Sequence, residues 1–100
     1  MRYEFHPDAL DEYQEAALYY ADCRRGLELR FVECVESAIQ RILNAPYAWG
    51  ILEDDVRRCL TPVFPYSVIY SIEPDYILML AVTHCRRKPG YWKYRNIQPT

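Results

Sequence analysis

The chain has 100 residues, 51% of them hydrophobic and only 3 of them glycine, which excludes a disordered protein of low hydrophobicity and high net charge. This length fits one domain over residues 1–100. The net charge is only −2, but residues 1–55 carry 5 Lys and Arg against 12 Asp and Glu, whereas residues 56–100 carry 7 against 2. This asymmetry predicts either a basic surface for an anionic partner or two halves that pair on folding.

No apolar run reaches the roughly 18 residues of a membrane span, the longest being Tyr76 to Val82. Because the N-terminal residues lack the apolar core of a signal peptide, we expect a cytoplasmic protein that does not associate with a membrane. The four cysteines are widely spaced and are expected to be free thiols. No nucleotide-binding, triad or zinc motif is present, so we expect no cofactor and no metal.

The N-terminal half predicts one strand and two helices. Arg2 to Phe5 alternate in polarity and precede Pro7, a residue favoured in the first turn of a helix. Apolar residues then recur at spacings of three and four until about Cys23, and Gly26 separates this helix from a second one that ends at Asn44. The apolar face of the second helix should consist of Phe31, Val35, Ala38, Ile39, Ile42 and Leu43. A short link between the helices predicts an antiparallel hairpin.

The C-terminal half predicts strands. After a loop expected over Tyr47 to Asp55, β-branched and aromatic residues dominate from Val56 onward. Residues 67–72 and 76–82 should form an antiparallel hairpin that turns at Pro74, and the last strand is apolar enough to lie inside the sheet. The order β-α-α-β-β-β, with a short basic C-terminal tail or helix, predicts an α+β fold in which the helical hairpin packs on a small, mainly antiparallel sheet.

The segment from His84 to Arg95 is the main candidate for function, because it combines five cationic side chains with three aromatic ones. Guanidinium groups pair with phosphates or carboxylates, and aromatic rings stack on bases or anchor in peptide grooves. For Tyr91 and Trp92 the alternative is that they cap the open end of the core. His84 could be a general acid or base near neutral pH, or a hydrogen-bonded structural residue.

Two further arginines open the first strand after the loop. Strand alternation places Arg57 and Arg58 on opposite faces, so only one of them can share a face with Arg86 or Arg87. A solvated arginine that protects a sheet edge is the alternative to a ligand-binding role.

Three groups of motifs stand in order along the chain: His6 to Glu12 with Tyr19-Tyr20; Phe64-Pro65-Tyr66 leading to Ile69-Tyr70; and Ala81 to His84 with Arg86-Arg87, Pro89 and Tyr91-Trp92. Together they resemble the ParE/RelE superfamily of toxins of type II toxin-antitoxin systems, over essentially the whole chain. The resemblance implies the same fold, plasmid stabilisation or growth inhibition, and a cognate antitoxin that wraps the toxin in a hetero-oligomer.

The resemblance implies one of two mechanisms. RelE-like toxins cleave mRNA on the ribosome, whereas ParE-like toxins poison DNA gyrase. For a nuclease, the candidate catalytic residues are Arg57, His84, Arg86, Arg87 and Tyr91. Candidate residues for binding the target or the antitoxin are Arg58, Lys88, Trp92, Lys93 and Arg95.

The sequence departs from the nuclease pattern at two positions. Ser67 stands where RelE-like enzymes carry an arginine, and a second such arginine falls at Cys85 or, with a shift of one residue, at Arg86. Losing one hydrogen-bond donor to the transition state raises the activation free energy by on the order of 3 kcal/mol. In addition, the pI of about 5.6 is low for a protein that binds the ribosome. We therefore favour a ParE-like gyrase poison; a RelE-like endoribonuclease is the alternative, and a non-toxic small binding module is the third hypothesis.

Overall fold

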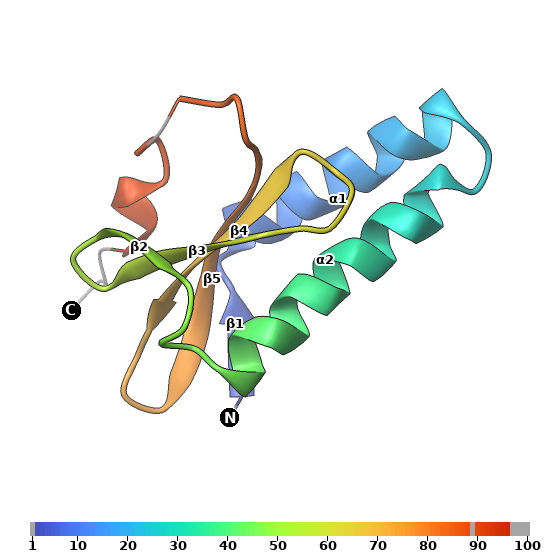
Figure 1. Cartoon of the computed structure of the whole chain (residues 1–100). Helices are drawn as coiled ribbons and strands as arrows, with labels where there is room; N and C mark the ends of the chain where they lie inside the picture. The colour runs from blue at the N-terminus through green and yellow to red at the C-terminus, as the bar shows by residue number, and fades with distance from the viewer. Residues whose placement is uncertain (1, 89, 97–100) are drawn as a thin grey trace.

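The structure, a computed structural model, describes residues 2–88 and 90–96. Its elements are β1 (Arg2–Phe5), α1 (Pro7–Cys23), α2 (Leu27–Asn44), β2 (Gly50–Glu53), β3 (Val56–Leu60), β4 (Tyr66–Ile72), β5 (Tyr76–His84) and a short 3-10 helix, η1 (Lys93–Asn96). Within these residues the strands form one sheet in the order β1-β5-β4-β3-β2, in which only β1 and β5 pair in parallel. Figure 1 shows the two helices as an antiparallel hairpin against this sheet. The predicted α+β fold is confirmed.

The two helices begin and end where local sequence signals predict. His6 caps α1 by accepting a hydrogen bond at Nδ1 from the backbone N–H of Asp8, and Pro7 occupies the first turn. Gly26 adopts a left-handed φ of 85° immediately before α2, a conformation that other residues take only with strain. No helix in the described part of the chain is long and apolar enough to cross a membrane.

The main core lies between the helices and the sheet. Five of the six residues predicted for the buried face of α2 are buried, and Leu43 is partly buried against them. Phe31 is fully buried, and its ring packs on the rings of Tyr13, Tyr20, Phe64 and Tyr66. These contacts join the helical hairpin to the loop that leads into β4.

The prediction of a loop over residues 47–55 is wrong for Gly50–Glu53, because these residues form the strand β2. All four residues of β2 are exposed, and the sequence Gly-Ile-Leu-Glu has no alternation of polar and apolar residues by which a strand could be predicted. The strand exists because its backbone pairs with β3, with an irregularity between Ile51 and Glu53. Asp54, with a φ of 45°, makes the tight connection to β3.

The hairpin of β4 and β5 forms as predicted around Pro74, and β5 lies inside the sheet between β1 and β4. Tyr70 is opposite Met79 while Ile69 is opposite Ala81, so Leu80 is an extra residue in β5. The face of the sheet away from the helices buries a second apolar cluster, composed of Val56, Ile69, Leu78, Leu80, Ala81 and Trp92. Trp92 covers this face from the C-terminal segment, which we define as residues 90–96.

Candidate functional site

The carboxylate of Glu12 fastens the C-terminal segment to α1. Its oxygens accept hydrogen bonds from the Tyr91 hydroxyl at 2.6 Å and from both terminal guanidinium nitrogens of Arg95, at 2.9 and 3.1 Å. The Arg87 guanidinium lies 3.5 Å away. Glu12 is only 12% exposed and Arg95 only 6%, so this ion pair is largely shielded from water.

Glu12 and Arg95 also complete the hydrogen bonding of β5. Strand β1 reaches only as far as Met79, whose carbonyl accepts a hydrogen bond from the backbone N–H of His6. Beyond that point Glu12 accepts from the backbone N–H of Val82 at 3.1 Å, and Arg95 donates to the carbonyl of Leu80 at 3.0 Å. Two side chains therefore stand in for an edge strand, because buried backbone groups need partners.

A second contact to α1 holds the end of the segment. The Tyr94 hydroxyl donates to the carboxylate of Asp8 and accepts from Nε of Arg95. The hydrogen bond from Tyr94 lowers the pKa of Asp8. Burial alone would lower the pKa of Arg95, but its hydrogen bonds to Glu12 and Tyr94 outweigh burial and raise it. The predicted contact residue Arg95 is therefore charged, buried and paired within the protein.

The aromatic residues of the segment are engaged with the protein itself. The Tyr91 ring carries the Arg87 guanidinium 3.7 Å above its centre, and its hydroxyl is bound to Glu12. Trp92 is 3% exposed in the second apolar cluster. This arrangement matches the alternative in which both residues cap the open end of the core.

Arg57 and Arg58 lie on opposite faces of the sheet, as alternation predicts. Arg57 faces the helical side, where its guanidinium donates to the carbonyls of Tyr47 and Trp49 at 3.0 and 2.9 Å. It holds the loop that enters β2 and does not share a face with Tyr91. Arg58 is exposed on the other face, beside the C-terminal segment.

His84 and Arg86 form the turn that follows β5. Nδ1 of His84 accepts a hydrogen bond from the backbone N–H of Arg86 at 3.0 Å, and the imidazole packs edge-on against Tyr66. One of the two ring nitrogens of His84 is therefore occupied by a hydrogen bond within the turn. The Arg86 side chain is exposed and has no ion pair among the described residues.

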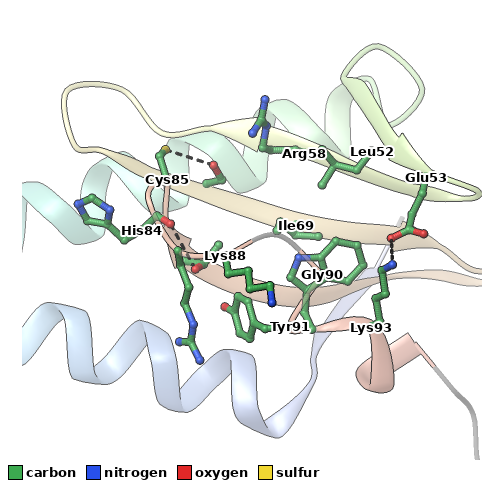
Figure 2. Close-up of a pocket in the computed structure, with 14 residues that line it drawn as sticks. Leu52, Glu53, Arg58, Ile69, His84, Cys85, Lys88, Gly90, Tyr91 and Lys93 are labelled. Atoms are coloured by element: carbon green, nitrogen blue, oxygen red, sulfur yellow. Dashed lines mark hydrogen bonds and ion pairs between the residues drawn. The ribbon is translucent and has the colours of Figure 1, made fainter.

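A pocket of about 230 Å³ opens between β2 and the C-terminal segment, on the helix-free face of the sheet (Figure 2). We call it the sheet pocket. It brings together seven of the predicted residues: Arg58, His84, Arg87, Lys88, Tyr91, Trp92 and Lys93. Arg57, Arg86 and Arg95 do not line it. Lys93 pairs with Glu53 of β2 at 3.3 Å and closes one end, while the hydroxyl of Ser67 lies 3.5 Å from the Cys85 sulfur at the other.

The sequence profile of the ParE toxin of type II toxin-antitoxin systems, parDE, matches residues 3–89. The chain belongs to the ParE toxin family. In fold it is similar to a solved chain of the chromosomal ParDE toxin-antitoxin system from P. aeruginosa, with a TM-score of 0.71 and 15% identity over 84% of this chain and 95% of that one. No curated protein matches the sequence.

The ParE family match ends at residue 89, so the C-terminal segment lies beyond it. Sequence reasoning identified this basic aromatic segment but missed its anchor on α1. Glu12 is separated from Tyr91 and Arg95 by 79 and 83 residues. The only local signal was that Asp8 and Glu12, four residues apart, share one face of a helix. In the described residues no three His, Cys, Asp or Glu side chains are placed to hold a metal.

Stability should fall in alkaline solution because burial holds several tyrosines neutral, Tyr70 and Tyr91 among them. Burial, and for Tyr91 also its bond to Glu12, raises the pKa of Tyr70 and Tyr91 to about 12. Since an unfolded tyrosine titrates near 10, this contribution is complete below pH 10 and is lost as pH rises from about 10 to 12. Urea unfolding between pH 8 and 12 should show that the free energy of unfolding falls with rising pH. The Tyr70→Phe variant should show a smaller fall. A pH-independent free energy of unfolding over this range would contradict the prediction.

Proposed function

We propose that this chain is a growth-inhibiting toxin that binds a protein target, with DNA gyrase as the first candidate, and that a cognate antitoxin neutralises it in a hetero-oligomer. Membership of the ParE family supports the toxin role. The observation that carries the choice of a binding mechanism is the Tyr91 hydroxyl, which is bound to Glu12 rather than open to a reacting group. We expect the chain to bind both gyrase and the antitoxin in the cytoplasm.

The geometry around Tyr91 supports the same choice. A nuclease of the RelE type would need several cations directed at one phosphate, because each donor to the transition state contributes on the order of 3 kcal/mol. Here Arg57 is bound to carbonyls on the opposite face of the sheet, and Arg87 is stacked on Tyr91. Ser67, at the place of a RelE-like arginine, faces the Cys85 sulfur instead.

A supercoiling assay with purified gyrase tests the proposal. We expect inhibition at micromolar toxin, and at least tenfold weaker inhibition by Arg86→Glu, which reverses an exposed charge that forms no ion pair among the described residues. Arg30→Glu, which reverses another exposed charge, on α2, should leave inhibition unchanged. If micromolar toxin leaves supercoiling by gyrase unchanged, gyrase is not the target.

Two further assays separate the other hypotheses. Primer extension on a translated message should show no new 5′ ends after induction; new ends would establish the RelE-like alternative. Induction of the gene alone should stop growth, and co-expression of a neighbouring antitoxin gene should restore it. Unimpaired growth would instead indicate a non-toxic binding module.

A further inference from the structure

The loop between β3 and β4 carries a strained residue at its tip. Val63 has a φ of 69°, in the left-handed region that a β-branched residue occupies only as an outlier. The backbone N–H of Phe64 donates to the carbonyl of Pro62 at 2.7 Å, which closes a tight turn of three residues around Val63. Glycine or asparagine tolerates such a backbone more easily. A valine at this position therefore destabilises the turn relative to either of them.

The neighbouring residues force the turn into this shape. The backbone N–H of Thr61 donates to the carbonyl of Tyr66 at 3.0 Å, and the Thr61 hydroxyl donates to the carbonyl of Phe64 at 3.0 Å. The ring of Phe64 packs on Tyr20 and Phe31 of the helical hairpin, beside which Figure 1 shows the loop. Strain of this kind persists only where the surrounding contacts over-determine the backbone. The turn is therefore held in one shape before any partner binds.

Packing inside the protein does not account for a valine at the tip of this turn. The Val63 side chain is 80% exposed, and Leu60, the last residue of β3, is 54% exposed. A single apolar side chain at the surface is ordinary by itself. Here, however, the exposed side chain stands on a backbone conformation that disfavours it, so a role outside the folded chain explains its presence better.

The charge and position of the loop indicate the class of partner. Residues 60–66 contain two prolines and no charged residue, so the tip offers no cation to the phosphates of a nucleic acid. The loop adjoins the turn that carries Arg86, because the backbone N–H of Cys85 donates to the carbonyl of Pro65 at 2.8 Å. Arg86 is the exposed cation at which we expect the target to bind. An apolar tip beside that cation fits a hollow in a protein surface better than a nucleic acid.

We propose that Val63 is a contact residue for the toxin's protein target and enters an apolar hollow on that target. This inference rests on the proposed function, but it does not depend on the target being gyrase. Burying a valine side chain on the target should strengthen binding roughly tenfold or more. Because the turn is already fixed, little conformational entropy is lost when the target binds.

Two measurements on Val63→Asn test the inference, because stability and toxicity should change in opposite directions. Asparagine tolerates a left-handed φ, so the variant should melt about 4 °C higher than the unaltered protein. Cells that express the variant at the same level should nevertheless form at least tenfold more colonies than cells that express the unaltered toxin. Val63→Thr keeps the branched shape but makes the side chain polar, so it should also lose toxicity. Leu18→Gln, which removes an apolar side chain that is 67% exposed on α1, should stay toxic.

The outcomes separate the roles that Val63 could have. A lower melting temperature for Val63→Asn would show that the turn is not strained, and equal toxicity of both Val63 variants would show that the side chain contacts no target; either result overturns the inference. Retained toxicity with at least tenfold weaker binding to the antitoxin, measured by calorimetry, would assign Val63 to the antitoxin and overturn it as well. If the unaltered chain does not stop growth, the proposed function itself fails. Growth arrest by the unaltered chain and by both Val63 variants refutes only the contact.

Discussion

Replacing Glu12 by alanine should lower the free energy of unfolding by about 3–5 kcal/mol, the range found when one partner of a buried ion pair is removed. Among the described residues, Arg95 would keep a buried charge with the more distant carboxylate of Asp8, at 3.9 Å, as its remaining ion-pair partner. The backbone N–H of Val82 would also lose its acceptor. Urea unfolding followed by circular dichroism measures the change.

Two variants show whether the effect belongs to the buried carboxylate. Glu15→Ala removes an exposed acid one turn further along α1 and should change stability by no more than about 0.5 kcal/mol. Glu12→Gln keeps one carbonyl acceptor but loses the charge, so its stability should lie between those of the wild type and Glu12→Ala. If Glu12→Ala is as stable as Glu15→Ala, the network does not hold the C-terminal segment.

Trp92→Ala should cost about 3–5 kcal/mol, the usual range for truncating a buried aromatic side chain. The indole covers the helix-free face of the sheet, and Trp92 is only 3% exposed. Its loss would expose Ile69 and Leu80 to water. Thermal or urea unfolding should show this loss in the protein alone, without any partner.

The control for Trp92 is an exposed aromatic residue. Tyr47 is 70% exposed, and Tyr47→Ala should have a much smaller effect on stability. Trp92→Phe should restore part of the lost stability, since it refills some of the cavity. A Trp92→Ala protein with unchanged stability but weakened antitoxin binding would instead make Trp92 an interface residue, which is one of the two roles predicted from the sequence.

Much of the fold was predictable because its signals are local. Pro7 in the first turn of α1, Gly26 between the helices and Pro74 in the last hairpin each mark a boundary that the structure retains. The apolar face of α2 follows from its 3.6-residue period. Strand β2 was missed because its exposed side chains carry no pattern and only pairing with β3 defines it.

The candidate site was predictable in composition but not in the role of each residue. Arg86 and Arg95 are both cationic residues of the same basic region, yet the structure leaves the side chain of one exposed and buries the other. No sequence signal separates them, because the difference depends on Glu12, which lies 83 residues from Arg95 along the chain. Strand alternation did predict that Arg57 and Arg58 lie on opposite faces, but not which of them faces the C-terminal segment.

The sequence by itself determined the family, the order of most elements and the presence of a basic aromatic segment after β5, since these depend on residue types and their spacing. The tertiary structure decided which cationic side chains bind groups of the chain itself: Arg57 binds loop carbonyls, Arg95 binds Glu12, and Lys93 pairs with Glu53 at the surface. Burial and pairing depend on contacts between distant parts of the chain. Those contacts leave Arg58, Arg86 and Lys88 exposed, and these residues remain candidates for binding a partner.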